Sequence, residues 1–199
     1  MPGVFAIADL HFNTIPNDMF LTLVENWGYS GDAMIVVGDT DTPERLSKWP
    51  FHKTQNLVVP GNTDPDQNKV VYRVLGDKIT VIGCLGANWP DTPWAHWHMH
   101  DQPCDPDPVL EWLEFEVSKA ITEEIILALH HPLSYSKDGK DIFHPRFVSL
   151  IKSDKRIKHI LHGHVHKGCG ELPAVCAQAR IHLVAADRLG YKPKKIASF

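Results

Sequence analysis

The sequence lacks several features that would each have indicated a class of protein. Its four cysteines are irregularly spaced with no Cys-x-x-Cys pair, so neither a zinc ribbon nor a thioredoxin-like site is indicated. The formal net charge of −4 shows no global basic surplus, so composition gives no strong signal for binding nucleic acid or an anionic membrane, although local basic patches are compatible with it. No apolar run approaches the roughly 20 residues of a membrane span, and no internal repeat or low-complexity tract is visible.

The N-terminus has no basic leader ahead of an apolar stretch, and the cysteines are best read as free buried thiols in a reducing compartment. We therefore expect a soluble, cytoplasmic protein. With 199 residues, of which 43% are apolar, the chain can bury a proper core of about the size of one domain. We expect a single domain over residues 1–199.

Short apolar runs bounded by polar residues predict buried β-strands at residues 4–8, 34–37, 57–59, 125–129 and 157–161. Residues 78–85 predict a further strand, which we expect to be antiparallel, and residues 181–185 and 195–199 predict closing strands. Helices are predicted after the N-cap Asn17, at Thr42-Pro43, from Asp107-Pro108 to Ile121, and at 145–151. Strands that alternate with helices indicate an α/β fold.

The segment at about 86–108 differs from the rest of the chain, because it contains three tryptophans, three histidines and five prolines. Proline excludes a regular element there, and the aromatic content does not suit a disordered linker, so we expect an ordered cap loop. Trp94, Trp97 and His98 are candidate substrate-binding residues, since the rings could stack on a base or another flat group. Packing of the cap on the domain is the alternative role for them.

The five apolar runs each end at side chains that can bind a metal. Because ligands of α/β sheets bind at the carboxyl ends of the strands, parallel strands would bring these side chains to one edge. The candidate ligands are Asp9, His11, Asp39, Asn62, His130, His164 and His166. Any one of them could instead cap a helix, but their shared position after five strands favours a metal site.

The residue types predict the kind of metal site. Seven mixed imidazole, carboxylate and amide ligands suit two cations that share an oxygen ligand. They fit divalent manganese, which we expect, or iron, zinc, cobalt or nickel, and the absence of thiolates argues against a soft metal. Two such ions about 3.5 to 4 Å apart lower the pKa of a bound water and hold a phosphoryl oxygen. The predicted chemistry is phosphoester hydrolysis.

Five sequence blocks carry a resemblance to a known family. Asp9-x-His11, Gly38-Asp39, Gly61-Asn62, His130 and Gly163-His164-x-His166 resemble, in identity and order, the signature of the calcineurin-like metallophosphoesterases. The resemblance implies a four-layer α/β/β/α sandwich. It also implies that Asp9, His11 and His166 hold one metal, that Asn62, His130 and His164 hold the other, and that Asp39 bridges them. A bridging hydroxide would then attack phosphorus in line.

Two positions depart from the family pattern. Thr63 stands where many members have a histidine that protonates the leaving alkoxide, and threonine cannot act as an acid near neutral pH. His131 and His11 are the other candidates for this acid, so His131 joins Asp39, Asn62 and His130 as a candidate catalytic residue. The second block also carries its acidic residue, Asp41, earlier than is usual in the family.

The block Gly61-Asn62-Thr63-Asp64 resembles a compact bacterial and archaeal branch that tends towards phosphodiester hydrolysis. We therefore expect a phosphodiesterase acting on a small-molecule, possibly nucleotide-like phosphoester, with a phosphomonoesterase as the alternative.

Two further hypotheses remain open. The run His96-Trp97-His98-Met99-His100-Asp101 approaches the His-x-His-x-Asp-His pattern of metallo-β-lactamase-like hydrolases, but its last two residues are swapped and it follows a proline-rich loop. A catalytically silent scaffold is the other hypothesis, because the retromer subunit that shares the family fold works through protein contacts. All seven candidate ligands are present in this sequence, which favours the enzyme.

Overall fold

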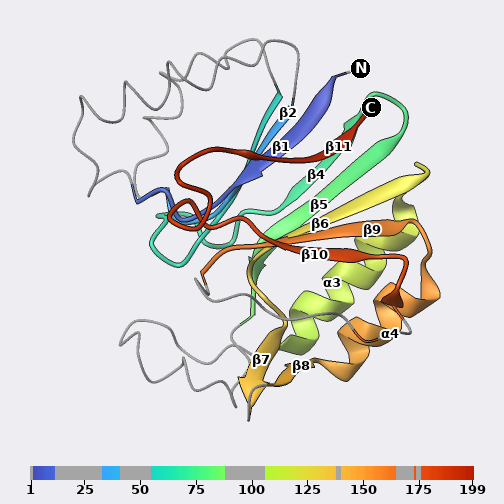
Figure 1. Ribbon diagram of the computed structural model, residues 1–199. Coiled ribbons are helices and arrows are strands. Elements are labelled where there is room, and N and C mark those ends of the chain that lie inside the picture. Colours follow the sequence, from blue (N-terminus) through green and yellow to red (C-terminus); the bar gives the residue numbers. More distant parts are fainter. Residues whose placement is uncertain are drawn as a thin grey trace.

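The computed structural model describes residues 2–11, 33–40, 55–87, 106–137, 140–164, 173 and 176–199. Two β-sheets lie face to face, and helices cover the outer face of the larger sheet (Figure 1). Among these residues, no helix combines the length and the apolar character needed to span a membrane.

The smaller sheet contains the N-terminal strands. Its order is β11-β1-β2-β3, with β1 at Gly3–Ile7, β2 at Ala33–Val37, β3 at Gln55–Val59 and β11 at Lys194–Ser198. The strands β1, β2 and β3 are parallel, and β11 pairs antiparallel with β1 at the edge. Every residue of β2 is buried, as its unbroken apolar sequence predicts for a central strand.

The larger sheet has the order β10-β9-β6-β5-β4. Its strands are β4 at Val71–Leu75, β5 at Ile79–Gly86, β6 at Glu124–His131, β9 at Ile157–His162 and β10 at Arg180–Leu183. The strands β5, β6, β9 and β10 are parallel, and β4 pairs antiparallel with β5. The carboxyl ends of β6 and β9 therefore lie at one end of this sheet.

Two helices and a hairpin cover the larger sheet. Helix α3 spans Pro106–Lys119 and α4 spans Pro145–Ser153, and each begins with proline, whose missing N–H costs nothing in the first turn. The hairpin consists of β7 at Ser134–Lys137 and β8 at Lys140–Phe143. Arg146 at the start of α4 bonds both carboxylate oxygens of Glu114 on α3 at 2.8 Å, which ties the two helices together.

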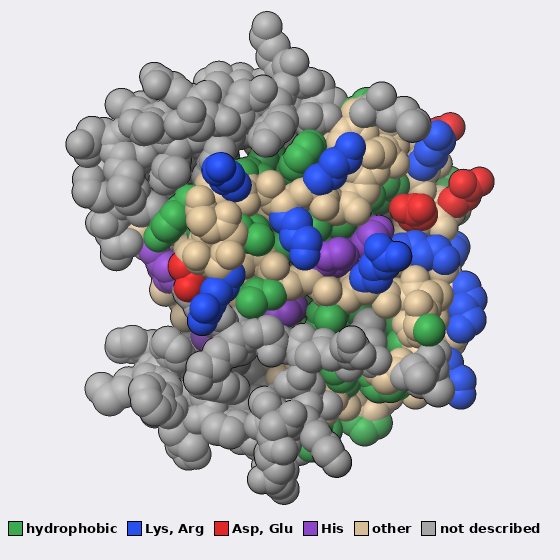
Figure 2. Space-filling model, viewed as in Figure 1, with side chains coloured by type: hydrophobic (Ala, Val, Ile, Leu, Met, Phe, Trp, Pro, Cys, Tyr) green, Lys and Arg blue, Asp and Glu red, His purple; other side chains and the backbone are tan. Residues whose placement is uncertain are grey.

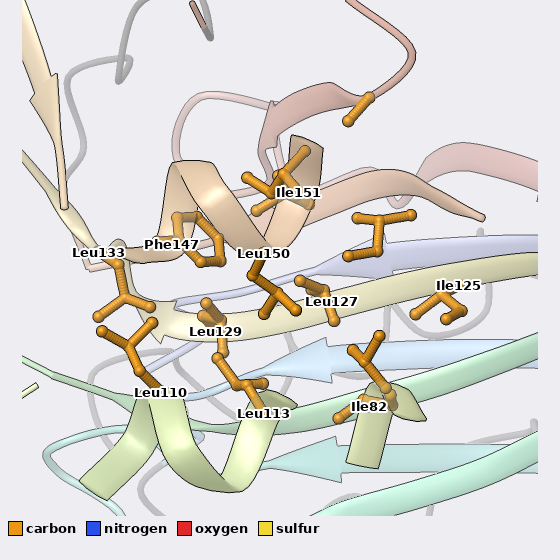
Figure 3. Close-up of a cluster of buried hydrophobic side chains, with 14 of the residues drawn as sticks. Ile82, Leu110, Leu113, Ile125, Leu127, Leu129, Leu133, Phe147, Leu150 and Ile151 are labelled. Carbon is orange, nitrogen blue, oxygen red and sulfur yellow. The ribbon is translucent and has the colours of Figure 1, made fainter. Parts of the chain in front are cut away.

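Two apolar cores separate the layers. One core lies between the sheets and includes Val37, Val59 and Leu161. The other lies between the larger sheet and the helices, where Leu127, Leu113 and Phe147 meet (Figure 3). The chain is thus an α/β sandwich with two central sheets, as the resemblance implied. The helices expected after Asn17 and at Thr42-Pro43 fall outside the described residues.

The eight strands expected from the sequence are confirmed with boundaries that differ by at most two residues. One expectation was only half right: β5 is antiparallel to β4 but parallel to β6. Strand β4 and the hairpin β7–β8 were not predicted. The apolar residues of β4 do not give a buried run, because it is an edge strand whose three central residues are exposed.

One prediction concerns stability against pH. His159 on β9 and His182 on β10 place Nδ1 and Nε2 3.0 Å apart. Burial lowers the pKa of both side chains, and together with the nearby charge of Lys194 it lowers the pKa of His182 to about 4. The unfolded chain therefore binds more protons than the folded chain between about pH 6.5 and pH 4, so stability should fall as the pH falls through that range.

The substitution His182→Gln should make stability less dependent on pH. We expect the urea midpoint of the variant to change less between pH 7 and pH 5 than that of the parent protein. An unchanged pH dependence would show that other groups cause the loss in acid.

Candidate metal centre

Six of the seven predicted ligands lie among the described residues, and they follow or end strands of both sheets. Asp9 and His11 follow β1, Asp39 follows β2 and Asn62 follows β3, all in the smaller sheet. In the larger sheet, His130 lies near the end of β6 and His164 follows β9. The expectation of one shared sheet edge is therefore corrected: the ligands come from the carboxyl ends of strands in two stacked sheets. His166 falls outside the described residues.

The first group of donor atoms surrounds the side chain of Asn62. Its Oδ1 lies 2.9 Å from Nε2 of His130 and 3.0 Å from Nδ1 of His164. Two ligands at right angles on a cation with bonds of about 2.1 Å are about 3.0 Å apart. The three side chains therefore fit ligands of one divalent ion, with nitrogen and oxygen donors suited to a transition metal.

The second group consists of Asp9, His11 and Asp39, whose potential ligand atoms all lie within 4.8 Å of one another. Oδ2 of Asp39 lies 3.7 Å from Nε2 of His11, and Oδ1 of the same carboxylate lies 3.4 Å from Nε2 of His130. Asp39 thus presents one oxygen to each group, which is one of the arrangements in which a carboxylate is shared by two cations.

The backbone is strained at four of the candidate ligands. Asp9, His11, Asp39 and His164 have φ angles of 54°, 43°, 53° and 57°. A residue other than glycine in this left-handed region costs of order 1 kcal/mol or more, so such a conformation persists only where the surrounding structure holds it. Four instances on residues with metal-binding side chains indicate that the strain belongs to the site and serves to direct these side chains inward.

Close contacts in the site require glycine at two positions. Gly38 has a φ of 83°, and a Cβ atom there would lie 2.3 Å from Nδ1 of His130. A Cβ atom on Gly61 would lie 2.1 Å from the backbone nitrogen of Asp39. Gly38 therefore lets the strand ends of the two sheets approach each other closely, and Gly61 does the same for two neighbouring strand ends of the smaller sheet.

A hydrogen bond fixes the orientation of the fully buried His130. Its Nδ1 donates to the carbonyl oxygen of Val37 on β2 at 2.9 Å. Nε2 consequently points at Asn62 and Asp39, and it is the nitrogen left for a metal ion. This pairing of one ring nitrogen with a carbonyl is the usual way in which a protein orients a histidine ligand.

His130 and Asp39 have complementary charges. Burial alone would lower the pKa of His130, but the hydrogen bond and charge of Asp39 outweigh it and raise the pKa to about 9. Burial likewise favours neutral Asp39, yet His130 and the backbone N–H of Thr63, 3.0 Å from Oδ1, hold the pKa of that carboxyl well below its usual range. A cation would take the place of the proton on His130, so its binding releases that proton.

His131 belongs to the same cluster. Its ring stacks on that of His164 with centroids 4.1 Å apart and an angle of 12° between the planes. His130, His131 and His164 form a group whose nitrogens lie within 4.8 Å of one another, so His131 is a further potential ligand. The sequence had singled it out only as a candidate catalytic residue.

Asp64 organises the site and was not recognised from the sequence. This buried carboxylate accepts hydrogen bonds from the N–H and Oγ1 of Thr40 at 2.9 and 2.6 Å, and from the N–H of Gly61 at 2.7 Å. It thereby joins the turn that carries Asp39 to the turn that carries Asn62. The Gly-Asn-x-Asp spacing was the available signal, since an aspartate two residues after a turn often bonds the backbone of that turn.

The candidate substrate residues Trp94, Trp97 and His98 lie outside the described residues, as does most of the cap expected at 86–108.

Comparison with known proteins identifies the fold. No family model and no curated protein matches the sequence. A dimetal phosphatase from Danio rerio has a crystal structure that superposes with a TM-score of 0.56, at 10% identity over 92% of this chain and 86% of that chain. The chain has the fold of this dimetal phosphatase.

Two other solved structures resemble the chain to different degrees. A second crystal structure superposes with a TM-score of 0.60, at 16% identity over 100% of both chains. A vacuolar protein sorting 29 structure from Cryptosporidium parvum reaches a TM-score of only 0.35, at 16% identity over 72% of this chain and 73% of that chain, and carries no weight here.

The hydrogen bonds of Asp64 lead to a testable prediction. The variant Asp64→Asn replaces one acceptor oxygen by a donor that faces N–H groups, so the two turns should separate and metal binding should weaken by about 10 to 100-fold. Titration calorimetry with manganese would measure the change. Asp66→Asn is the matched control, because Asp66 is exposed and two residues away. Equal affinity in the Asp64 variant and the parent protein would contradict the positioning role.

Proposed function

We propose that the protein is a phosphodiesterase that depends on two divalent metal ions. The observation that carries this proposal is the position of the Asp39 carboxylate, with one oxygen toward His11 and the other toward His130. A shared carboxylate between two groups of nitrogen and oxygen donors is characteristic of dinuclear hydrolytic sites. The fold, which a dimetal phosphatase shares, supports the same conclusion.

The side chains divide into two sets around Asp39. Asp9 and His11 form one set, to which we add His166 on the sequence alone. Asn62, His130 and His164 form the other. When bound, two such ions would polarise the phosphoryl oxygens and lower the pKa of a water between them. The nitrogen and oxygen donors favour manganese, iron, zinc, cobalt or nickel, and we propose manganese.

The chain's own residues supply preorganisation. The strained turns at Asp9, Asp39 and His164 fix the carboxylates and imidazoles before substrate arrives, so little reorganisation is needed during the reaction. A third of the His11 side chain is exposed, whereas Asp39 is almost completely buried. Substrate would therefore approach from the side of His11.

The site favours esters whose leaving groups have a low pKa. Thr63 uses its backbone N–H on Asp39, and its exposed side chain cannot supply a proton near neutral pH. Without an acid at that position, the reaction favours leaving groups that need no proton, such as the phenolates of aryl diesters. His131, which stacks on His164, and His11, which lies beside Asp39, are placed closely enough to the site to assist as acids.

The bridging role of Asp39 can be tested by neutralising it. Asp39→Asn should lower the manganese content from two ions per chain and reduce turnover of an aryl phosphodiester by at least about a thousandfold, because one substitution weakens both sites. Metal analysis of protein purified without chelator, together with a diesterase assay, measures both effects. Asp77→Asn, on an exposed turn, controls for the change in charge.

Two results would contradict the proposal. Full activity with one manganese ion per chain would exclude the dinuclear site. Saturated metal sites without hydrolysis of any phosphoester would instead favour the silent scaffold.

The missing acid at position 63 yields a further prediction. In the parent protein, the rate for a series of substituted aryl esters should fall steeply as the pKa of the leaving phenol rises. Thr63→His should flatten this dependence and accelerate hydrolysis of alkyl esters by about a hundredfold or more, which is the usual contribution of a positioned acid. Thr63→Gln is the control of similar size. A flat dependence in the parent would show that another residue already serves as the acid.

A further inference from the structure

The charges of the chain are separated along its length. Residues 150–199 contain ten of the twenty Lys and Arg residues but only three of the twenty-four Asp and Glu residues, which gives a formal charge of +7. Residues 1–149 carry −11. The overall charge of −4 therefore conceals a basic segment, and such asymmetry is typical of chains that bind a polyanion.

The fold gathers this charge on one side of the sandwich. The edge strands β10 and β11 belong to different sheets but lie on the same side of the molecule, joined by the turn at residues 184–193 (Figure 1). Figure 2 shows this side: Lys and Arg side chains are spread across it with His among them, whereas Asp and Glu gather toward its borders. We call this surface the basic face and define it by the Lys and Arg residues of β9, β10, β11 and the turn between β10 and β11, which are Lys158, Arg180, Arg188, Lys192, Lys194 and Lys195.

Most of these charges are not neutralised. In the part of the chain that the structure describes, Lys158, Arg180, Lys192, Lys194 and Lys195 form no ion pair. Other bases are paired, as Lys119 is with Glu116 and Arg156 with Asp154. These charges also act on His182. Burial is the main cause of its lowered pKa, and the charges of Lys194 and Arg180 lower that pKa further. The basic face is thus available to an external anion.

The basic face begins next to the metal centre. After β10, the N–H of Ala8 donates to the carbonyl of Val184 at 2.7 Å, and the N–H of Ala186 donates to the carbonyl of Ala8 at 2.8 Å. Ala8 immediately precedes the candidate ligand Asp9. The turn that carries Arg188 and Lys192 therefore starts beside the smaller sheet's metal-binding end, and a bound chain could pass from the basic face to that end.

We propose that the basic face binds a single strand of nucleic acid and directs its phosphodiester backbone toward the metal centre. The choice of a nucleic acid rests on the proposed phosphodiesterase function, since a polymer of phosphodiesters is both the ligand and the substrate. An anionic membrane fits less well: the exposed large apolar residues of the described chain, such as Tyr72 and Phe115, lie on β4 and α3, and β4 is at the opposite edge of the sheet from β10.

An aromatic residue accompanies the charges. Tyr191 lies in the same turn and has a φ of 57°, a conformation that a bulky residue adopts only when its surroundings hold it there. Its N–H donates to the carbonyl of Ala186 at 2.8 Å, which fixes the turn beside Asp9. Tyr191 is partly exposed and is followed closely in the chain by Lys192, Lys194 and Lys195. Aromatic and basic residues together bind single strands, with phosphates on the cations and a base on the ring.

Binding can be measured without hydrolysis. In EDTA, fluorescence anisotropy of a labelled 20-nucleotide oligothymidylate should show binding by the full-length protein that weakens steeply with salt. The triple variant Arg180→Gln, Lys192→Gln, Lys195→Gln removes three exposed cations. We expect its affinity at low salt to fall at least about tenfold, and the slope of log K against log salt to decrease by about 2 in magnitude, for three phosphate contacts.

Two further variants separate the contributions of position, charge and stacking to oligonucleotide binding. Arg73→Gln, Lys78→Gln, Lys152→Gln lowers the net charge equally but changes exposed bases outside the basic face, so it should bind nearly as the parent does. Tyr191→Leu should weaken binding severalfold without changing the salt slope, because stacking releases no counterions. Thermal melting of each variant would establish that it is folded.

Three outcomes would overturn the proposal. The parent protein could fail to bind the oligonucleotide at low salt, or the control triple variant could lose as much affinity as the first. Tighter binding to phosphatidylserine vesicles than to the oligonucleotide would assign the basic face to a membrane. Because no turnover is measured, each outcome is distinct from a failure of the proposed hydrolytic function, which the aryl diester assay tests.

Discussion

The contacts of His130 join the two sheets at the point where the candidate metal ligands meet. This residue belongs to β6 of the larger sheet, yet its Nδ1 donates to Val37 on β2 of the smaller sheet, and its Nε2 lies 2.9 Å from Asn62. A fully buried imidazole is costly unless its polar atoms find partners. Here those partners come from the opposite sheet, so the packing of the sandwich and the geometry of the site depend on the same side chain.

The surrounding structure extends this constraint. Asp39 balances the charge of His130, and Asp64 accepts hydrogen bonds from the turns after β2 and β3. Both carboxylates are buried, so the polar ends of three strands are held by groups that water hardly reaches. The apolar cores on both faces of the larger sheet keep those strands in place and leave the polar network little freedom to relax. That rigidity explains how four candidate ligands, none of which is glycine, can keep a left-handed backbone conformation.

The site and the basic face illustrate two uses of the same architecture. The carboxyl ends of strands in both sheets meet at one end of the sandwich and provide the donors for metal ions. The edges β10 and β11 form one side of the sandwich and bring together cations from two sheets. The hydrogen bonds of Ala8 to Val184 and Ala186 connect the two regions through a single short turn. Hydrolytic chemistry and recognition of a charged polymer can therefore be adjacent without sharing residues.

The sequence by itself determined the elements and the chemistry of the site. Runs such as residues 34–37 and 125–129 are apolar throughout, because strands covered on both faces bury every side chain, and so they could be recognised without a structure. The donors Asp9, Asp39, Asn62 and His130 could be recognised because each follows or ends such a run. Strand β4 escaped notice because an edge strand is constrained by only one neighbour and tolerates the exposed Tyr72 and Val74.

Only the tertiary structure decided which strands share a sheet, and hence which donors meet. Pairing between strands distant in the chain depends on backbone hydrogen bonds that carry no residue code, so the residue pattern alone suggested a single parallel edge where there are two stacked sheets. Asp64 could not be recognised either, because its importance lies in three hydrogen bonds to two turns that meet only in the fold. Arg180 and Lys194 are likewise separated in the sequence, and packing brings both charges near His182. The sequence supplies side chains with a definite chemistry, and the fold determines the distances between them.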